Sequence, residues 1–417
     1  MSFGDCEADR GLRDAWRQFC RRLEKAGEDA FKSTIPAKPL HRADAFRFLT
    51  QNLGQAFDLA LESRNTRYPV IHAFCTPFCK LGGDNADYTY QQAWIDSSSV
   101  YRISGNRGTA RFFNIAVQGP RPEINPRRPG WRNLHEPFGD TPEANLFGHH
   151  MKVGWDGSFE VYVGGPRRES NWLPTTSGSR KLFIRQGFDD WLERPAQMRI
   201  ERMGMSGPRP LPTPDEMIEA MEWAGNFLTG MMRDNPDWAY EYSEDVNPEE
   251  VNRFPAARRD FGDPVYNVGR DRLRGRSIYA MCWELAPDEA MVISWDKNDL
   301  FWMMTNMGSC ENSMDYLYRP VSYTPSRTKV DGDGKIRMVM AHKDPGFNNW
   351  IDTSGFESGM LVNRNQGTDH ITTFETQVVK HVDLPRYLPS DSARVTPEER
   401  LEQMRQRFHS ILRRYCF

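Results

Sequence analysis

The sequence lacks long apolar runs. Its 417 residues include no stretch of 18 consecutive apolar residues, whereas a helix that crosses a bilayer needs about 20 of them. The N-terminal segment Met1–Glu7 is polar and acidic, so it also lacks the basic start and apolar centre of a signal peptide. We therefore expect no membrane association and a location in the cytoplasm.

An excess of charge of one sign is missing as well. Lys and Arg number 54 against 57 Asp and Glu, which gives a formal net charge of -3. Nucleic-acid binding requires clustered basic residues that neutralise phosphates, so we expect no nucleic-acid partner. The locally basic stretch Arg121–Arg132 is broken by three prolines and is typical of a solvated surface loop.

Residue patterns that bind metals or cofactors are scarce. The seven cysteines are widely spread, and only Cys75 and Cys79 lie close together. A single Cys-x-x-x-Cys pair is a poor zinc ligand set, so we expect reduced structural thiols. The chain also has no Gly-x-Ser-x-Gly, no phosphate-binding loop and no dinucleotide fingerprint. No cofactor is therefore expected.

Helical periodicity is present in three parts of the chain. Apolar residues recur at spacings of three and four in 8–66, in 214–232 and in a segment that begins at Thr396. A proline-containing break divides the first part into two helices. Thr213, Pro214 and Glu216 form a capping-box pattern, which predicts the start of the second part. The polar stretch 235–276 is expected to be irregular, with short helices as the alternative.

Short β-type runs fill much of the remaining chain. They alternate with turn signals, which is typical of a sandwich or barrel. The runs begin at Tyr101, Arg111, Phe159 and Leu182 in the first half, and at Ile278, Met291, Leu300, Ile336 and Met360 in the second. Aromatic residues make up 12% of the chain, which indicates an aromatic interior.

One sequence pattern occurs twice. Asp156-Gly-Ser-Phe-Glu-Val-Tyr-Val is followed after a loop by Asn171-Trp172, and Asp333-Gly-Lys-Ile-Arg-Met-Val-Met is followed by Asn349-Trp350. Asp-Gly favours a hairpin turn, and the run after it is a strand. Each Asn-Trp pair, with Trp in the core and Asn bonded to backbone, begins a corner. We infer a duplication that produces two related β modules.

These patterns predict an α+β protein that is mainly β, with two related sandwich-like or jelly-roll-like modules. We expect an N-terminal helical region at 1–80, a first β module at 81–212 and a helical and irregular linker at 213–276. A second β module at 277–385 and a C-terminal helix at 386–417 complete the chain. At roughly 100–200 residues per domain, the length agrees with two or three units.

Four segments resemble a bacterial protein family. They are Gly83-Asp84-Asn85-x-Asp87, Tyr101-Arg-Ile-Ser-Gly-x-Arg-Gly-Thr109, Trp283-Glu-Leu-Ala-Pro-Asp-Glu-Ala290 and Ala341-His-Lys-Asp-Pro-Gly-x-x-Asn-Trp-x-Asp-Thr353. Together they are similar to the family named for the domain of unknown function 1214, over most of residues 80–385. The resemblance implies β-sandwich modules and no established activity. Phe356 departs from it, because the family pattern leads us to expect His there.

The two copies of the repeat differ near the corner. The second copy carries His342, Asp344 and Asp352 where the first has no His or carboxylate. A His near neutral pKa that a carboxylate orients is a common arrangement for proton transfer, so these three are candidate catalytic residues. The structural alternative is that His342 donates to a backbone carbonyl and the two aspartates cap loops.

Other side chains are candidates for substrate binding. Arg107, Arg185 and Arg364 are able to clamp a carboxylate or a phosphate. Asn349, Trp350 and Trp172 at the two corners offer hydrogen bonds and ring faces. An arginine that pairs with a buried aspartate is the structural alternative.

Asp84 and Asp87 are the candidate metal ligands. They are close oxygen donors on a glycine-rich loop, which suits Mg²⁺ or Ca²⁺. No further acidic residues follow at the spacing of a known metal-binding loop, and an Asx turn is the structural alternative.

Three functions are consistent with these residues. The leading hypothesis is a cofactor-independent acid–base enzyme, a hydrolase or lyase, that acts on a hydrophobic small molecule in an aromatic-lined cavity. The second is a non-catalytic module that binds a carbohydrate or another ring compound. The third is a Mg²⁺-dependent enzyme on a phosphorylated or diphosphate substrate. Each has a small-molecule partner, and each is compatible with a homo-oligomer.

Overall fold

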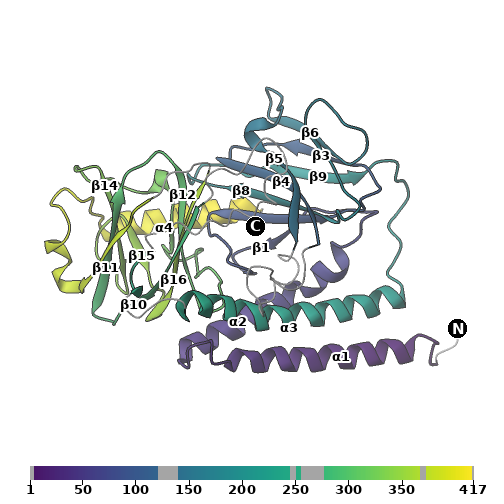
Figure 1. The fold of residues 1–417 in the computed structure, drawn as a ribbon, viewed down its shortest axis with the longest axis horizontal. Helices are drawn as coiled ribbons and strands as arrows, with labels where there is room; N and C mark the ends of the chain where they lie inside the picture. Colours follow the sequence, from purple (N-terminus) through teal and green to yellow (C-terminus); the bar gives the residue numbers. More distant parts are fainter. Residues whose placement is uncertain (1–3, 121–139, 245–249, 255–276, 367–371, 416–417) are drawn as a thin grey trace.

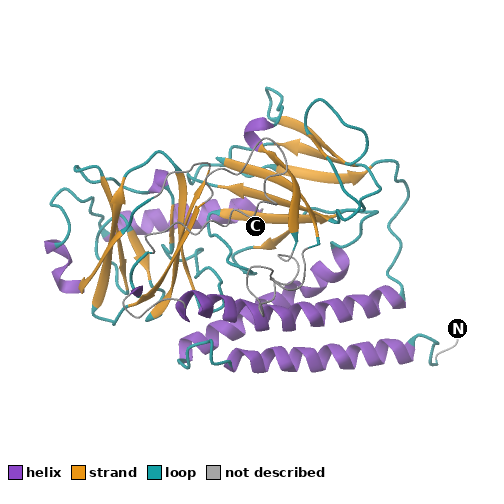
Figure 2. Ribbon diagram, viewed as in Figure 1, coloured by secondary structure: helices purple, strands orange, loops and turns teal. Residues whose placement is uncertain are grey.

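A computed structural model describes residues 4–120, 140–244, 250–254, 277–366 and 372–415. Two β sandwiches lie next to each other, and three helices run along one side of them (Figure 1). Strands dominate both sandwiches, and a further helix passes from the second sandwich towards the first (Figure 2). The predicted α+β fold with two related β modules is confirmed. The predicted loop 121–132 lies outside the described residues.

The three helices at the side are α1 (Asp9–Glu28), α2 (Pro39–Phe57) and α3 (Pro214–Glu244). Both α1 and α2 pack against α3, and a π-helical turn, Asp58–Glu62, continues α2. The predicted capping box starts α3, because Thr213 N–H donates to Glu216 and Glu216 N–H donates back to the Thr213 hydroxyl. No helix among the described residues is long and apolar enough to cross a bilayer.

The prediction ended the second helical part too early. Helix α3 runs on past Met232 to Glu244 and includes Pro236. The polar sequence after Asn235 has no apolar periodicity, so the pattern gave no sign of these last turns. At the C-terminus, α4 begins at Pro397, directly after Thr396 as the sequence predicts, and ends at Tyr415. The predicted bound of 386 falls in a 3₁₀ turn, His381–Arg386, and was too early.

The first module has two sheets. The strands of the larger sheet, in spatial order, are β1 (His72–Cys75), β2 (Tyr88–Trp94), β8 (Lys181–Gly187), β4 (Phe112–Gly119) and β5 (Thr141–Phe147). The smaller sheet contains β7 (Trp172–Leu173), β6 (Ser158–Val163), β3 (Tyr101–Asn106) and β9 (Gln197–Arg202). Strand β1 lies within 1–80, which the sequence assigned to a helical region, because four residues are too few to show a strand period.

The second module repeats this arrangement. One sheet contains β10 (Ser277–Glu284), β16 (Ser358–Gln366), β12 (Phe301–Met307) and β13 (Ser322–Tyr323). The other contains β15 (Trp350–Asp352), β14 (Lys335–Ala341), β11 (Glu289–Asp296) and β17 (Glu375–Lys380). Apart from the extra edge strand β1, the two modules have the same strand order in both sheets, including the parallel pairs β6–β7 and β14–β15.

The hydrogen bonds of the repeated segment also correspond. The glycines of the two Asp-Gly turns, Gly157 and Gly334, have left-handed φ angles of 83° and 81°. Each corner tryptophan donates its indole N–H to a backbone carbonyl at 3.1 Å, Trp172 to Gly164 and Trp350 to Ala341. The corner therefore fixes where each sandwich closes, and its residues have a structural function in both copies.

Each module has its own apolar interior. Residues from both sheets of the first module, such as Ile103, Ile115 and Ile184, form one buried cluster. The second module has a corresponding cluster that includes Trp283, Trp302 and Met338. A third cluster joins the helices, the outer face of the larger first sheet, and Phe301 and Met303 of the second module. This third cluster links the modules, and the polar residues described below lie close to it.

Candidate functional site

The three candidate catalytic residues at the second corner have separate structural partners. His342 lies with Nε2 3.1 Å from the Leu285 carbonyl and with Nδ1 2.9 Å from the Thr353 hydroxyl. A carbonyl oxygen only accepts, so in the neutral ring Nε2 donates and Nδ1 accepts from Thr353. Both ring nitrogens are therefore engaged, as the structural alternative for this residue predicts.

The two aspartates of that set face other groups. Asp344 pairs with Arg400 Nε at 2.9 Å and accepts from Gly346 N–H. Asp352 pairs with Arg319 at 2.8 Å and accepts from Ser354 N–H. Within the described part of the chain, no hydrogen bond or ion pair joins any two of the three candidates. This geometry provides no acid–base pair at the corner.

The candidate binding residues are divided among different places. Asn349 and Trp350 are buried in the second corner, and Trp172 is half-buried in the first. Arg107 donates to the Ala110 carbonyl and lies over the Phe113 ring, 4.6 Å from its centroid, at one end of the first module. These four side chains therefore do not share one site.

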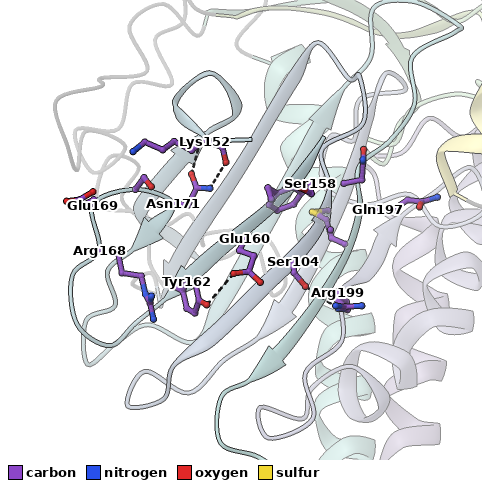
Figure 3. Close-up of a pocket in the computed structure, with 15 residues that line it drawn as sticks. Ser104, Lys152, Ser158, Glu160, Tyr162, Arg168, Glu169, Asn171, Gln197 and Arg199 are labelled. Atoms are coloured by element: carbon purple, nitrogen blue, oxygen red, sulfur yellow. Dashed lines mark hydrogen bonds between the residues drawn. The ribbon is translucent and has the colours of Figure 1, made fainter. Parts of the chain in front are cut away.

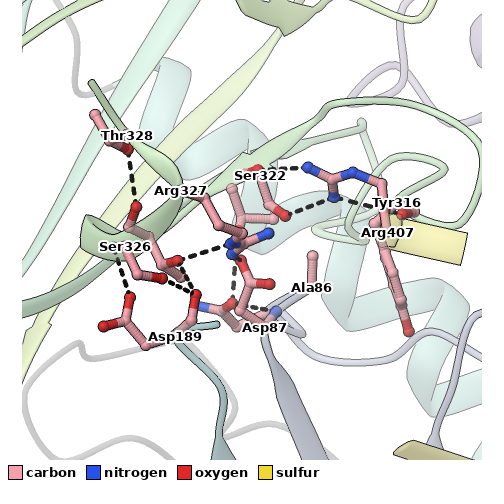
Figure 4. A network of polar contacts seen from close by, with 12 residues as sticks. Ala86, Asp87, Asp189, Tyr316, Ser322, Ser326, Arg327, Thr328 and Arg407 are labelled. Carbon is pink, nitrogen blue, oxygen red and sulfur yellow. Dashed lines mark hydrogen bonds and ion pairs between the residues drawn. The ribbon is translucent and has the colours of Figure 1, made fainter. Parts of the chain in front are cut away.

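The candidate metal ligands are bonded to protein groups. Asp84 accepts hydrogen bonds from the backbone and hydroxyl of Ser313, at 2.9 and 2.6 Å. Asp87 pairs with Arg327 at 2.6 Å (Figure 4) and lies 3.6 Å from Arg414. Cations and donors already offset these carboxylates, which makes them weak metal ligands. Across the residues that the structure covers, no three His, Cys, Asp or Glu side chains form a metal-binding group.

A large open groove lies on the outer face of the smaller first-module sheet. It has a volume of about 1010 Å³. Its lining includes Ser104, Glu160, Tyr162, Arg168, Asn171 and Arg199, which project from the sheet and adjoining loops (Figure 3). In the second module the corresponding face is apolar, and Leu384 and Leu388 cover it. This face is therefore open and polar in the first copy, and covered and apolar in the second.

A second arrangement lies where the modules meet. The loop 308–313, which follows β12, contacts the glycine-rich loop that carries Asp84. Gly83 N–H donates to the Glu311 carbonyl at 2.8 Å, and Arg364 Nη2 donates to the Gly83 carbonyl at 2.6 Å. Glu311 has a left-handed φ of 53°, which is strained for a residue other than glycine. Such strain persists only where the surroundings enforce it.

Glu311 and Arg364 are buried without full pairing. Glu311 is 9% exposed and Arg364 8%. Glu311 Oε2 and Arg364 Nη1 have no hydrogen-bond partner in the described structure. Burial raises the pKa of Glu311 to about 7; Arg364 opposes this shift and Asp84 adds to it. A buried carboxyl group that titrates near neutral pH is typical of functional sites.

The absence of a side chain at Gly83 makes room for this pair. A Cβ there would lie 3.0 Å from Glu311 Oε1 and 3.5 Å from Arg364 Nη2, and the φ of Gly83 is +67°. Glycine is the residue that adopts this angle without strain. The glycine-rich loop therefore lets the backbone approach both charged groups.

Helix α2 holds the other side of the 308–313 loop. His41 Nδ1 lies 2.5 Å from the Ser309 hydroxyl, and Asp44 accepts from the Asn312 amide at 3.2 Å. Burial lowers the pKa of His41 to about 4 and raises the pKa of Asp44. His41 also contacts the edge of Phe356, at a centroid distance of 5.0 Å. The loop is therefore fixed from both sides.

Lys80 lies behind Asp84 and is fully buried. Its ammonium group donates to the carbonyls of Ser313 and Met314, both at 2.6 Å, and lies over the Tyr316 ring. Burial lowers its pKa to about 8, and Asp84 opposes the shift. Lys80 thus supplies positive charge that opposes the rise in the Asp84 pKa, and its hydrogen bonds join the two modules.

Aromatic side chains surround this junction. Tyr90 receives the Asn85 N–H on its hydroxyl oxygen, and its ring stacks against Tyr88 and Phe183. Arg364 is close enough to oppose the rise that burial causes in the Tyr90 pKa. Arg185 pairs with Tyr90 in strand register and lies over the Phe183 ring. The candidate arginines Arg185 and Arg364 thus both lie close to Tyr90.

The sequence did not single out Glu311, His41 or Asp44. Glu311 lies in a short loop with no motif, far from Arg364 in sequence, and its contact with Gly83 exists only after the modules dock. The one available signal was the resemblance of the Gly83–Asp87 segment to a family motif, which marked the opposite side of the contact.

Comparison with known proteins supports the fold. The chain is similar to the crystal structure of an uncharacterised protein from Burkholderia cenocepacia, with 28% sequence identity and a TM-score of 0.77. The similarity covers 90% of this chain and 99% of that one. That protein has the same overall architecture, and its description assigns no activity.

Other solved structures are too distant to support a statement about fold or function. The VPA0106 protein from Vibrio parahaemolyticus is 14% identical over 86% of this chain and all of its own, with a TM-score of 0.41. Procruciferin, an 11S globulin from Brassica napus, is 8% identical over 81% of this chain and 94% of its own, with a TM-score of 0.20. No family model matches the chain. No curated protein matches it either.

Proposed function

We propose that this chain is an acid–base enzyme, a hydrolase or lyase, in which Glu311 transfers the proton and Arg364 binds the negative charge of the substrate. One observation carries the proposal. A carboxyl group and a guanidinium of the second module, which both face Gly83 of the first, are buried, and each has an atom with no hydrogen-bond partner among the described residues. Buried polar atoms are nearly always paired, so this pair suits a polar group of a ligand.

The ionisation of Glu311 suits proton transfer. With a pKa of about 7, the group exists in both forms near neutral pH. It can therefore accept a proton from water or from an acidic carbon, and return it to a leaving group. Arg364 would stabilise the oxyanion that develops on the substrate, because buried donors act strongly on such charge. Both roles use side chains that the chain itself supplies.

The surroundings favour a hydrophobic substrate. Tyr88, Tyr90, Phe183 and Phe301 belong to the buried cluster beside this pair. Aromatic faces recognise ring compounds, and Arg364 recognises a carbonyl or carboxylate oxygen. We therefore propose aromatic esters and aromatic hydroxy acids as the first compounds to try.

The test is a turnover screen with these two compound classes. The wild-type protein is expected to convert at least one compound, and Glu311→Gln to convert it at least about 100-fold more slowly, which is the usual contribution of a general acid or base. His342→Ala is the control at the second corner and should keep most of the activity. If His342→Ala lost activity and Glu311→Gln kept it, the result would contradict the role of Glu311 and place the active site at the second corner.

A second candidate function rests on the polar groove. Donors and acceptors such as Asn171, Glu160 and Arg199 suit the hydroxyl groups of a carbohydrate. Their face of the sheet is open, while the matching face of the other module is closed. This non-catalytic function predicts saturable sugar binding that Glu160→Gln weakens and Glu311→Gln leaves unchanged. Titration with a panel of oligosaccharides distinguishes the two functions.

The remaining predictions from the sequence are also proposals. We propose membership of the family named for the domain of unknown function 1214 on the residues quoted above, and a location in the cytoplasm. The six cysteines in the described chain are free thiols, which is consistent with a reducing compartment.

A further inference from the structure

A cluster of three arginines surrounds Asp87 at the end of the glycine-rich loop. The side chains of Arg327 and Arg414 are 5% and 1% exposed, and Arg407 is 3% exposed. They come from different parts of the chain: Arg327 follows β13, and the other two lie on α4. Figure 4 shows Arg327 and Arg407 converging on the region of Asp87.

Several N–H groups of these arginines make no hydrogen bond within the described structure. Arg327 Nε donates to the Thr324 hydroxyl and its Nη2 pairs with Asp87, but Nη1 has no partner in the described structure. Arg414 Nη1 donates to the Ala86 carbonyl, while its Nε and Nη2 likewise have none. Both terminal nitrogens of Arg407 are bonded, to Ser322 and to the Tyr316 carbonyl.

Positive charge is in excess. Asp87 is the one carboxylate that pairs with these arginines among the described residues. The nearby ion pair of Arg111 with Asp189 is balanced, and Glu193 is close enough to Arg414 to interact with it. The carbonyl end of α4 offsets part of the charge of Arg414. Within the described residues, the three guanidiniums still outnumber the one carboxylate that forms ion pairs with them.

The energetics of burial make this excess informative. Buried charges are ordinarily paired, because leaving one uncompensated is costly. Burial and the neighbouring Arg327 lower the pKa of Arg407 to about 9, while Asp87 opposes the shift. Trp191 orients the three guanidiniums, which lie 4.0, 4.9 and 5.7 Å from its ring centroid. The donors are therefore held in place rather than free to turn towards other partners.

We propose that Arg327 and Arg414, with Asp87 between them, form a binding site for a phosphate-type oxyanion. Guanidinium groups present paired N–H donors that match the oxygens of such a group. The anion would accept from Arg327 Nη1 and from Nε and Nη2 of Arg414, and would balance the charge. It is either free inorganic phosphate or the phosphate of a small organic molecule. This site is separate from Glu311 and does not depend on the proposed enzyme activity.

The experiment is a calorimetric titration of the full chain with inorganic phosphate, and separately with phenyl phosphate, at constant ionic strength. Wild-type protein should bind one phosphate saturably, and its melting temperature should rise with phosphate but not with added chloride. Arg327→Gln should weaken binding at least tenfold. Asp87→Asn removes the competing carboxylate and should bind phosphate severalfold more tightly, which a purely structural role of Asp87 does not predict.

Arg400→Gln is the matched control. Arg400 is also a buried arginine of α4, but Asp344 balances it, so this variant should keep wild-type phosphate affinity even if it is less stable. A preference for phenyl phosphate over phosphate identifies an organic ligand, and equal affinity identifies the free anion. No saturable binding to wild type, or equal binding by wild type and Arg327→Gln, would overturn the proposal. If Arg327→Gln does not fold, the titrations of wild type and Asp87→Asn still test whether the site binds phosphate.

Discussion

Asn171 and Asn349 hold the same backbone junction in the two modules. Asn171 bonds both to the N–H and to the C=O of Lys152, at 2.8 and 2.7 Å. Asn349 bonds in the same way to Lys329, at 2.9 and 2.8 Å. An asparagine thus closes the corresponding corner in each module. This shared geometry supports the duplication more strongly than the sequence similarity does.

The two corners are expected to differ in what they contribute to stability. Asn349 is buried and donates to a second carbonyl, that of Arg337, whereas Asn171 is partly exposed. Asn349→Asp removes both donated bonds and buries a charge, so we expect a loss of roughly 3–5 kcal/mol. Asn171→Asp should cost about 1 kcal/mol. Urea denaturation of both variants measures this, and equal losses would contradict the difference in burial.

His342 is expected to stabilise the second corner. His342→Ala removes the bonds to Leu285 and Thr353, so the free energy of unfolding should fall by about 1–3 kcal/mol. Thr353→Val, which removes one of these bonds from the other side, should cost less. A double variant whose loss is smaller than the sum of the single losses would show that the two side chains act together.

Gly83 is expected to be needed for space as well as for its backbone angle. Gly83→Ala should destabilise the protein by about 1–2 kcal/mol for the left-handed backbone, plus a further cost for crowding Glu311. Gly334→Ala is the matched control, since Gly334 has a φ of +81° and a Cβ there meets nothing within 4 Å. Denaturation should therefore show a larger loss for Gly83→Ala; equal losses would mean that crowding at Glu311 is unimportant.

The ionisation of Glu311 is expected to make stability depend on pH. Its pKa is about 7 in the folded chain, above the ordinary value of 4.5. The stability linked to its proton is therefore fully present below pH 4.5 and lost as the pH rises through 7. Relative to wild type, Glu311→Gln should gain on the order of 2–3 kcal/mol between pH 4.5 and pH 8.

That comparison also removes the effect of other buried groups. His41 has a pKa of about 4, lowered from 6.5, so its contribution rises with pH between those values. Asp44, Asp84 and Lys80 titrate in both proteins as well. Their contributions cancel to first order when the curves for wild type and Glu311→Gln are subtracted. A difference that stays constant from pH 4.5 to pH 8 would place the Glu311 pKa outside this range.

Local patterns were sufficient to predict much of the fold. The capping box before α3, the two Asp-Gly turns and the strands that begin near Tyr101 and Ile336 depend on neighbours in sequence, and the structure confirms them. Strands of two or three residues, such as β7, β13 and β15, carry too few residues to show a period. Their pairing depends on contacts made elsewhere.

The candidate site was harder to predict for the same reason. Arg364 was selected from the sequence as an anion-binding residue, and it lies at the module junction. Its neighbours Gly83 and Glu311 are distant in sequence, and Gly83 meets it only when the first module docks on the second. The left-handed φ of Glu311 is a further tertiary effect that residue preference does not indicate.

The dependence of turnover on Glu311 tests the central claim most directly. The rate of conversion of the best compound should be measured from pH 5 to pH 9 in wild type and Glu311→Gln. The proposal predicts a wild-type profile with an inflection near pH 7 and a Glu311→Gln rate lower by about 100-fold or more, without that inflection. A Glu311→Gln variant that keeps both the rate and the inflection of wild type would contradict it.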